Sequence, residues 1–425
     1  LVHQFGTMLP DEGPDGLLQC GLGNFYRNPD HAPFTAGYIA ADHQFDTPVR
    51  LSIAGLDAEI TPAPSDATDS VTIWFPSLRL CVNNLVWPAL FNIYAIRGEE
   101  YRDPRVLLQG IDHIVDLDPI HLLGTHGPPL SGDRVVPETK RYRDAIQFIW
   151  DQTVRGANQG LSLSQLTERV VLPDIYAESY LTWQLYGLVE HHVRQIHAGL
   201  FGWFDERESN LFPVPEAQRH ARLIAGFGGR GAVRAQMAAA LDAGDLRWAV
   251  ELASWLTYSD GADDDDRGGL AEGLRAIAQR TTSANIRNWC LTRALELEGT
   301  LDLQRHRIHR LRQADVLKAE PARFVAVMRV LLDPARADGL DAHVAWQFAS
   351  GECAGLHVRG GVAVPTDGAA ADVTLGMSHE TWAAIAGGKN TLAAAIDEGI
   401  VSVDGDGALL ERFVGAFEHS GLNSQ

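Results

Sequence analysis

The sequence has 425 residues, which exceeds the roughly 250–300 residues at which single hydrophobic cores stop growing, so two or three domains are expected. Its 55 acidic and 35 basic residues give a formal net charge of -20, which argues against nucleic acid and anionic membrane surfaces as partners. No apolar run reaches the roughly 18 residues that a membrane-spanning helix requires. The four cysteines lie far apart, so neither a zinc ribbon nor a disulfide framework is predicted.

The first part of the chain, residues 1–132, has the pattern of short strands separated by turns. Strands are predicted over residues 49–53, 71–75, 78–82 and 121–124, and apolar residues at helical spacing predict a helix over 105–117. The last of these strands leads into a loop that carries His126. Strand, helix, strand and a histidine-bearing loop are typical of the end of an α/β sandwich.

Residues 133–305 are predicted to form an all-helical domain. Long amphipathic periods predict helices that include residues 142–154, 176–200, 216–224, 230–243 and 249–256. Ser162 and Gln165 resemble a capping box at the start of a further helix. The four aspartates from Asp263 to Asp266 are interpreted as a solvated charged turn rather than a calcium site, because no EF-hand spacing surrounds them.

The third part, residues 306–425, shows strands first and helices after them. Strands are predicted over 344–348, 356–359 and 373–375, followed by helices over 378–386 and 391–398, a strand over 400–403 and a closing helix over 408–417. This order predicts a compact α+β unit. The whole chain is therefore predicted to be an α+β multidomain protein.

Three residues beside the predicted strands are candidate metal ligands. His126 lies in a loop held rigid by a glycine and two prolines, although it could equally be a loop histidine bonded to a carbonyl. Asp66 precedes a strand at a sheet edge, where an Asx-turn is the alternative. Asn84 offers a neutral oxygen, a weaker ligand for divalent metals than carboxylate or imidazole, and it could also form a turn, as could Asn83 beside it.

Two arginines near Asn92 are candidates for binding an oxyanion. The guanidinium groups of Arg97 and Arg102 match tetrahedral anions such as sulfate or phosphate, with ion pairs to neighbouring acidic residues as the alternative. On a helix further along, His191 could act as a general acid near a leaving oxygen. His192 follows it at about 100° around the helix, so one of the two could face a cavity while the other packs in a core.

These pieces, in this order, resemble the alkyl-sulfatase branch of the metallo-β-lactamase superfamily over essentially the whole chain. The matching stretches include 92–103, His126-Gly127-Pro128, 142–144, 151–155, 202–205 and 244–249. The resemblance implies part of a metallo-β-lactamase αββα sandwich over residues 1–132, an all-α dimerisation domain over 133–305 and a sterol-carrier-like α+β domain over 306–425. It also implies a homodimer.

The resemblance further implies a hydrolase that holds two zinc ions and cleaves alkyl sulfate esters to alcohol and sulfate. The family's His-x-His-x-Asp-His cluster is not found among the 16 histidines, so the chain is expected to be N-terminally incomplete. The positions carried over from the family are metal ligands at His126, Asp66 and Asn84, sulfate contacts at Asn92, Arg97 and Arg102, and an acid at His191. At Asn84 the family has a bridging glutamate, and this departure alters the charge balance of the second metal.

Two other functions stay open on the sequence. One is a non-catalytic dimeric protein that binds lipid or alkyl chains. The substitution at Asn84 and that at Phe91, where the family has a histidine, favour it slightly. The other is a metallohydrolase of other apolar anionic esters, lactones or thioesters, because a fold does not determine a substrate.

Overall fold

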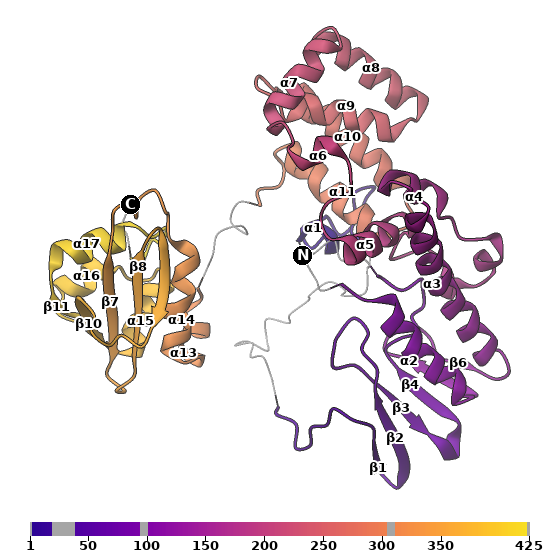
Figure 1. Ribbon diagram of the computed structural model, residues 1–425, viewed down its shortest axis with the longest axis horizontal. Coiled ribbons are helices and arrows are strands. Elements are labelled where there is room, and N and C mark those ends of the chain that lie inside the picture. The colour runs from indigo at the N-terminus through magenta and orange to yellow at the C-terminus, as the bar shows by residue number, and fades with distance from the viewer. Residues whose placement is uncertain (1, 19–38, 94–100, 304–310, 423–425) are drawn as a thin grey trace. The chain divides into compact units, whose positions relative to one another are not determined.

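The computed structural model describes residues 2–18, 39–93, 101–303 and 311–422. The chain divides into two compact units, residues 1–302 and 303–425, which Figure 1 shows in indigo to orange and in orange to yellow. In the parts described, no helix is both long and apolar enough to cross a membrane. The division of the first unit into a sheet domain and a helical domain at residue 132 stays a prediction.

The first unit contains a six-stranded sheet in which the strands follow one another in chain order. The strands are β1 (Val49–Ile53), β2 (Leu56–Pro62), β3 (Val71–Phe75), β4 (Leu80–Asn83), β5 (His121–Gly124) and β6 (Leu130–Ser131). Neighbours are antiparallel except β4 and β5, which α2 (Pro104–Asp116) joins as a parallel pair. Asp103 caps α2 by accepting a hydrogen bond from the Arg105 amide, and Pro104 occupies the first turn, where a missing N–H does no harm.

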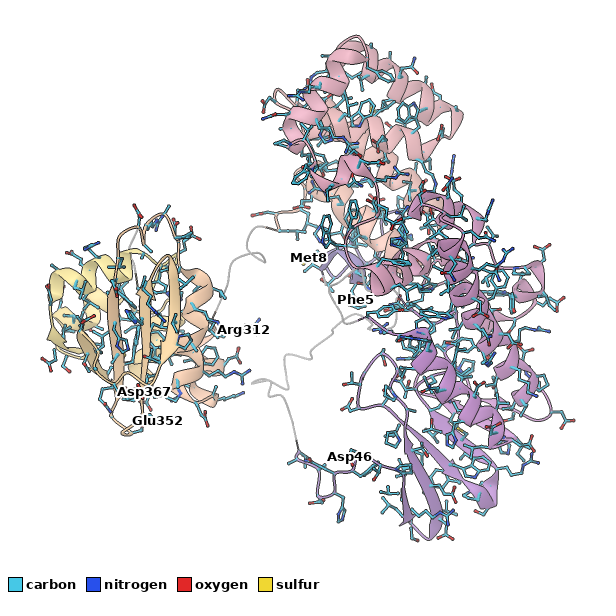
Figure 2. The ribbon with its side chains drawn as sticks, viewed as in Figure 1. Phe5, Met8, Asp46, Arg312, Glu352 and Asp367 are labelled. Carbon is cyan, nitrogen blue, oxygen red and sulfur yellow. The ribbon has the colours of Figure 1, made fainter. Side chains whose placement is uncertain are left out.

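Apart from one short helix at the start of the chain, the helical part of this unit follows the sheet. Its helices are α1 (Val2–Phe5), α3 (Val135–Asn158), α4 (Leu163–Arg169), α5 (Val189–Phe201), α6 (Glu208–Leu211), α7 (Glu216–Gly226), α8 (Arg230–Ala243), α9 (Leu246–Thr257), α10 (Asp264–Arg280) and α11 (Ala284–Leu297). The predicted capping box of Ser162 and Gln165 is confirmed at the start of α4. Phe5 of α1, labelled in Figure 2, lies in the helical part of the unit. It packs with Ala284 and Tyr186, far away in the sequence.

Two expectations about this region are wrong. The predicted helix over 176–200 begins only at Val189, because the chain before it forms two short 3₁₀ turns, Asp174–Glu178 and Tyr180–Thr182. The aspartate run begins helix α10 and is not a turn: Asp263, Asp264 and Asp265 are exposed as expected, but Asp263 and Asp266 form a capping box, and Asp266 is fully buried. Asp266 accepts hydrogen bonds from Arg230 and Arg234, which compensates the burial of its charge.

One hydrophobic core joins the sheet to the helices beside it. Trp74 of β3, Ile111 of α2, Tyr142 and Ile149 of α3 and Val193 of α5 belong to the same cluster of buried side chains. A separate core lies among α8 to α11. Because the first core includes both sheet and helices, residues at the end of the sheet are held against α5.

The second unit has a five-stranded sheet in the order β11-β10-β7-β8-β9, with β10 and β7 parallel. Its strands are β7 (Ala342–Phe348), β8 (Cys353–Arg359), β9 (Val362–Thr366), β10 (Val373–Met377) and β11 (Ser402–Gly405). Its helices are α13 (Gln313–Lys318), α14 (Pro321–Val327), α15 (His379–Ala386), α16 (Leu392–Asp397) and α17 (Gly407–Gly415). Trp346, Trp382 and Phe413 are fully buried between sheet and helices, so this unit has a core of its own.

Candidate active site

Asn84, just after β4, links three segments of the sheet unit. Its Nδ2 lies 2.6 Å from Asp66 Oδ1 and 3.0 Å from Ser65 Oγ, and its Oδ1 accepts a hydrogen bond from the Thr125 hydroxyl. The structure therefore brings the predicted Asp66 and Asn84 together, and Asn84 is bonded to Thr125, the residue before His126. Metal binding by these residues stays a prediction.

The local fold at this point depends on Asn83. Its side-chain Oδ1 accepts hydrogen bonds from the amides of Leu85 and Val86 at 2.9 and 2.7 Å, which turns the chain directly after the strand. Its Nδ2 donates to the Leu123 carbonyl of β5. These bonds make Asn83 the residue that forms the turn. The side chain of Asn84 points to Asp66 instead.

Trp87 is the centre of the site, and sequence reasoning missed it. Its ring centroid lies 4.6 Å from that of His126, 4.8 Å from that of Phe91 and 5.8 Å from that of Tyr186, and its indole N–H donates to the Asn84 carbonyl. No motif marks it, because a tryptophan after a turn more often belongs to a core. We call Asp66, Asn84, Trp87, Phe91, Arg102, His126 and His192 the Trp87 cluster.

Arg102 adds a buried positive charge to this cluster. Its side chain is only 6% exposed, its guanidinium donates to the Asn92 carbonyl at 2.7 Å and it lies 5.8 Å from the centroid of Phe91. Burial lowers the pKa of Arg102, while the nearby Asp66 and Tyr186 raise it. Asn92 contributes its carbonyl, and its side-chain Oδ1 is buried with no hydrogen-bond partner in the part of the chain that the structure describes. Arg97 lies outside the described residues.

The two adjacent histidines of α5 have different surroundings. His192 is fully buried, and burial, followed by the charges of His191 and Arg102, lowers its pKa to about 3. Burial also lowers the pKa of His191, with Glu190 opposing the shift. The sequence suggested His191 as the acid. The histidine whose pKa is lowered by the charge of Arg102 is its neighbour, His192. Only the 100° step between neighbouring helical residues signalled that the two would differ.

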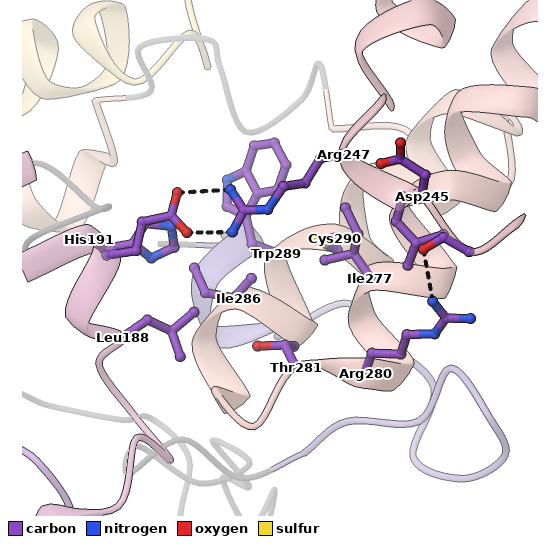
Figure 3. A pocket seen from close by; sticks show the side chains of 13 residues that line it. Leu188, His191, Asp245, Arg247, Ile277, Arg280, Thr281, Ile286, Trp289 and Cys290 are labelled. Atoms are coloured by element: carbon purple, nitrogen blue, oxygen red, sulfur yellow. Dashed lines mark hydrogen bonds and ion pairs between the residues drawn. The ribbon is translucent and has the colours of Figure 1, made fainter. Parts of the chain in front are cut away.

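His191 lines a hollow of about 860 Å³, at about 100° around α5 from His192 (Figure 3). There the Glu190 carboxylate accepts hydrogen bonds from Arg247 at 2.6 and 3.1 Å, and a further one from Arg194 at 3.2 Å. These arginines lower the pKa of Glu190 to about 2 against the effect of burial. By contrast, the hollow between Trp87 and His126 holds only about 10 Å³, so a ligand of the cluster would approach from the exposed side of His126.

The Trp87 cluster does not by itself fit a zinc site. Nowhere in residues 2–18, 39–93, 101–303 and 311–422 do three or more His, Cys, Asp or Glu side chains gather as a metal ion would require. Within the cluster, Asp66 accepts a hydrogen bond from Asn84, His126 packs against Trp87 and His192 is fully buried on α5, so these three strong donors do not converge on one point. A structural or catalytic zinc usually takes three or four protein ligands that surround the ion.

Comparison with known proteins decides the family. The chain is 33% identical over 431 residues to a linear primary-alkylsulfatase of Pseudomonas sp. (strain ATCC 19151), an alignment that covers 98% of this chain and 80% of the relative. The chain belongs to the alkylsulfatase family. Residues 162–300 match the family model of alkyl sulfatase dimerisation, and residues 311–422 match that of the alkyl sulfatase C-terminal region.

Other alkylsulfatases give the same result. An (R)-specific secondary-alkylsulfatase of Pseudomonas sp. is 28% identical, with 98% of this chain and 63% of the relative covered. The solved structure of a double mutant of the sec-alkyl sulfatase PisA1 has a TM-score of 0.80 at 27% identity and covers 98% of this chain and 66% of its own. The expected alkyl-sulfatase resemblance and the α+β multidomain architecture are therefore confirmed.

Proposed function

We propose that this protein hydrolyses alkyl sulfate esters to an alcohol and inorganic sulfate. The observation that carries the proposal is the 33% identity to a named primary-alkylsulfatase along 98% of the chain. Relatives named for primary and for secondary alkyl sulfates both align along the whole chain, so the proposal covers both substrate classes. The names also support a hydrolase over a non-catalytic lipid-binding protein.

Arg102 is the proposed binding group for the sulfate ester. Its guanidinium is shielded from water, so its attraction for an anion is screened less than that of a surface arginine. The bond to the Asn92 carbonyl orients the group, and Asp66 and Tyr186 help to keep it charged. Arg97 is proposed as a second guanidinium for the same anion, on the family resemblance alone.

The proton donor to the departing alkoxide is proposed to be His191. Because burial lowers its pKa, His191 is neutral at pH 7 and must take up a proton before it can donate one. An approaching sulfate ester would favour that uptake, since its negative charge stabilises an imidazolium. His192 is proposed to stay neutral and to position Arg102, because its pKa is lowered to about 3.

Zinc is the metal that the family resemblance implies, and we propose it as the cofactor. The residues described do not fit a zinc site, and none of the proposed residue roles involves the metal. The direct measurement is the metal content of the purified protein by mass spectrometry. Zinc retained after dialysis supports the assignment, and a protein that releases sulfate while free of metal contradicts it.

A homodimer is proposed from the match of residues 162–300 to the dimerisation model. Large apolar side chains in that range are strongly exposed, with Trp203 at 77% and Phe212 at 87%, as expected of a surface that another chain covers. Light scattering coupled to size exclusion tests it. A mass of twice 46.4 kDa is the expected result, and a monomer at micromolar concentration contradicts it.

The proposed function is tested by sulfate release from decyl sulfate. Arg102→Gln is expected to lower kcat/KM about 100-fold, the usual effect of losing one preorganised donor to a developing charge. The matched control is Arg105→Gln, since Arg105 lies three residues away, is exposed and pairs with Asp103. Equal losses in both variants would contradict a substrate role for Arg102.

A further inference from the structure

Gly199, near the end of α5, is a point of close approach between this helix and the chain segment that carries Arg102. A Cβ atom at Gly199 would lie 2.7 Å from Cε1 and from Cζ of the Tyr101 ring and 3.0 Å from its Cδ1. Only a residue without a side chain lets the ring lie this close to the helix backbone. The glycine is therefore the position at which α5 receives Tyr101.

Tyr101 is held against α5 by its ring. The side chain packs against the core that joins the sheet to the helices. Its hydroxyl oxygen is buried and forms no hydrogen bond within the part of the chain that the structure describes. Burial, followed by the charge of Asp103, raises the pKa of this phenol. Packing of the ring, rather than a hydrogen bond of its hydroxyl, therefore keeps Tyr101 in place.

The backbone is fixed on both sides of Arg102. Tyr101 precedes it and lies on α5, and Asp103 follows it and caps α2 by accepting a hydrogen bond from the Arg105 amide at 2.9 Å. Between these two anchors, the Arg102 guanidinium donates to the Asn92 carbonyl at 2.7 Å. A shift of either anchor therefore moves the guanidinium within the Trp87 cluster.

One face of α5 lies next to both Tyr101 and Arg102. Gly199 and His192 are seven residues apart, so they lie on the same face of the helix, about two turns from each other. Burial, followed by the charges of His191 and Arg102, lowers the pKa of His192, which places Arg102 near that histidine. The helix that Tyr101 contacts is thus the helix beside which the Arg102 guanidinium lies.

We infer that the contact between Tyr101 and Gly199 positions Arg102 to bind the sulfate group of the substrate. Tyr101 and Gly199 are positioning residues, since both act through the backbone of Arg102. This role rests on the proposed function, in which Arg102 is the binding group for the anion. A displacement of about 1 Å at a reacting centre can lower a rate about 100-fold, so the placement of one ring is enough to alter catalysis.

The test measures the binding of inorganic sulfate by calorimetry, which needs no ester to be cleaved. Gly199→Ala adds a methyl group that the Tyr101 ring cannot accommodate without moving, so it should weaken sulfate binding about tenfold. Arg102→Gln should weaken it at least as much. Unchanged binding in Gly199→Ala would overturn the inference, and so would an unaltered protein whose sulfate binding does not depend on Arg102.

A matched control separates positioning from overpacking. Gly273 of α10 is also a helical glycine, and a Cβ atom there would lie 2.9 Å from Cγ2 of Val250, which packs against the separate core among α8 to α11. Gly273→Ala should lower the midpoint of urea unfolding, as Gly199→Ala does, yet bind sulfate as the unaltered protein does. Equal weakening of sulfate binding in the two variants would show a general effect of destabilisation and would contradict the positioning role.

Substitutions at Tyr101 test the other partner of the contact. Tyr101→Phe keeps the ring and removes only a hydroxyl without a partner, so it should bind sulfate within about twofold of the unaltered protein. Tyr101→Leu shortens the side chain and should weaken binding about threefold. Combined with Gly199→Ala, the leucine leaves room for the methyl group, so the double variant should bind no more weakly than Tyr101→Leu alone. Losses that multiply in the double variant would show that the two residues act independently, and would overturn the inference.

Sulfate release from decyl sulfate distinguishes this inference from the proposed function. If sulfate binding depends on Gly199 and Arg102 but no ester is cleaved, the positioning role holds and the proposed function fails. If the ester is cleaved with the same kcat/KM by Gly199→Ala and by the unaltered protein, the proposed function holds and the positioning role fails. The expected result is cleavage by both proteins, with kcat/KM about tenfold lower in Gly199→Ala.

Discussion

The two faces of α5 carry the same residue type in opposite environments. His192 is fully buried, and the nearby charge of Arg102 helps to lower its pKa. His191 instead lines an open pocket next to the Glu190–Arg247 pair. On one face, aromatic rings exclude water around a single cation; on the other, ion pairs remain partly solvated around an apolar wall. Neighbouring residues on one helix can thus have different electrostatic environments.

The pKa shifts of His191 and His192 share one cause and differ in another. Burial is the first cause of the shift for both histidines, and the charge of Arg102 acts only on His192. The acidic group beside His191, Glu190, acts in the opposite direction and favours its protonation. The buried side of α5 around His192, which we call the sealed face, therefore suits binding and positioning. The side around His191, which we call the open face, suits exchange of protons and ligands with solvent.

The largest effect is expected from removing the ring that organises the sealed face. Trp87→Ala should lower the free energy of unfolding by about 3–5 kcal/mol, because His126, Phe91 and Tyr186 lose their common packing partner. Urea unfolding measures it. Ile39→Ala, on a side chain that is 88% exposed and lies outside residues 162–300, is the control and should change stability by no more than about 0.5 kcal/mol. A Trp87→Ala loss as small as that of the control would show that the cluster is loosely packed.

A smaller effect should distinguish the two histidines by pH. His192 has a native pKa of about 3, so below pH 6.5 the unfolded chain binds a proton that the native state does not, and stability is lost as pH falls. Between pH 7.5 and 5 this accounts for about 2 kcal/mol, which His192→Gln should remove. His191→Gln should remove less, because Glu190 partly offsets the shift. The opposite order would reverse the assignment of the two faces.

The smallest effect is expected at the open face. Glu190 has its pKa lowered to about 2, so its contribution is present above the ordinary value of 4.5 and is lost as pH falls from 4.5 towards 2. Because Arg247 is exposed, Glu190→Gln should destabilise by only about 0.5–1 kcal/mol at pH 6. The difference between variant and unaltered protein should close by pH 2.5, and a constant difference across that range would contradict the ion-pair account.

Much of the fold follows from local patterns in the sequence. The strands at Val49–Ile53 and Val71–Phe75 lie where alternation predicts them, and α2 begins one residue before its predicted start because Asp103 caps it. The helix expected over 176–188 fails for a tertiary reason: the Leu90 amide donates to the Trp183 carbonyl and the Ala284 amide donates to the Leu185 carbonyl, so these carbonyls are held by distant segments. The spacing of apolar residues along the sequence gives no sign of such contacts.

The site was predictable only in part. Family order predicted that Asp66, Asn84 and His126 lie near one another, and the structure joins Asp66 to Asn84 and Asn84 to Thr125, which precedes His126. Trp87 could not be found, because its role arises from rings contributed by segments up to about a hundred residues apart. The burial of Asp266 was missed for a similar reason, since Arg230 and Arg234 reach it from another helix. Side-chain partners distant in sequence leave no local signal.

The central claim is that the protein cleaves alkyl sulfate esters, and the most direct test is the product balance from decyl sulfate. Inorganic sulfate would be measured by ion chromatography and decanol by gas chromatography in the same reaction. The account predicts that the two products appear in equal amounts, at a rate that saturates with substrate and falls about 100-fold in Arg102→Gln. No sulfate above the level of the buffer alone, from the folded protein supplied with zinc, would contradict it.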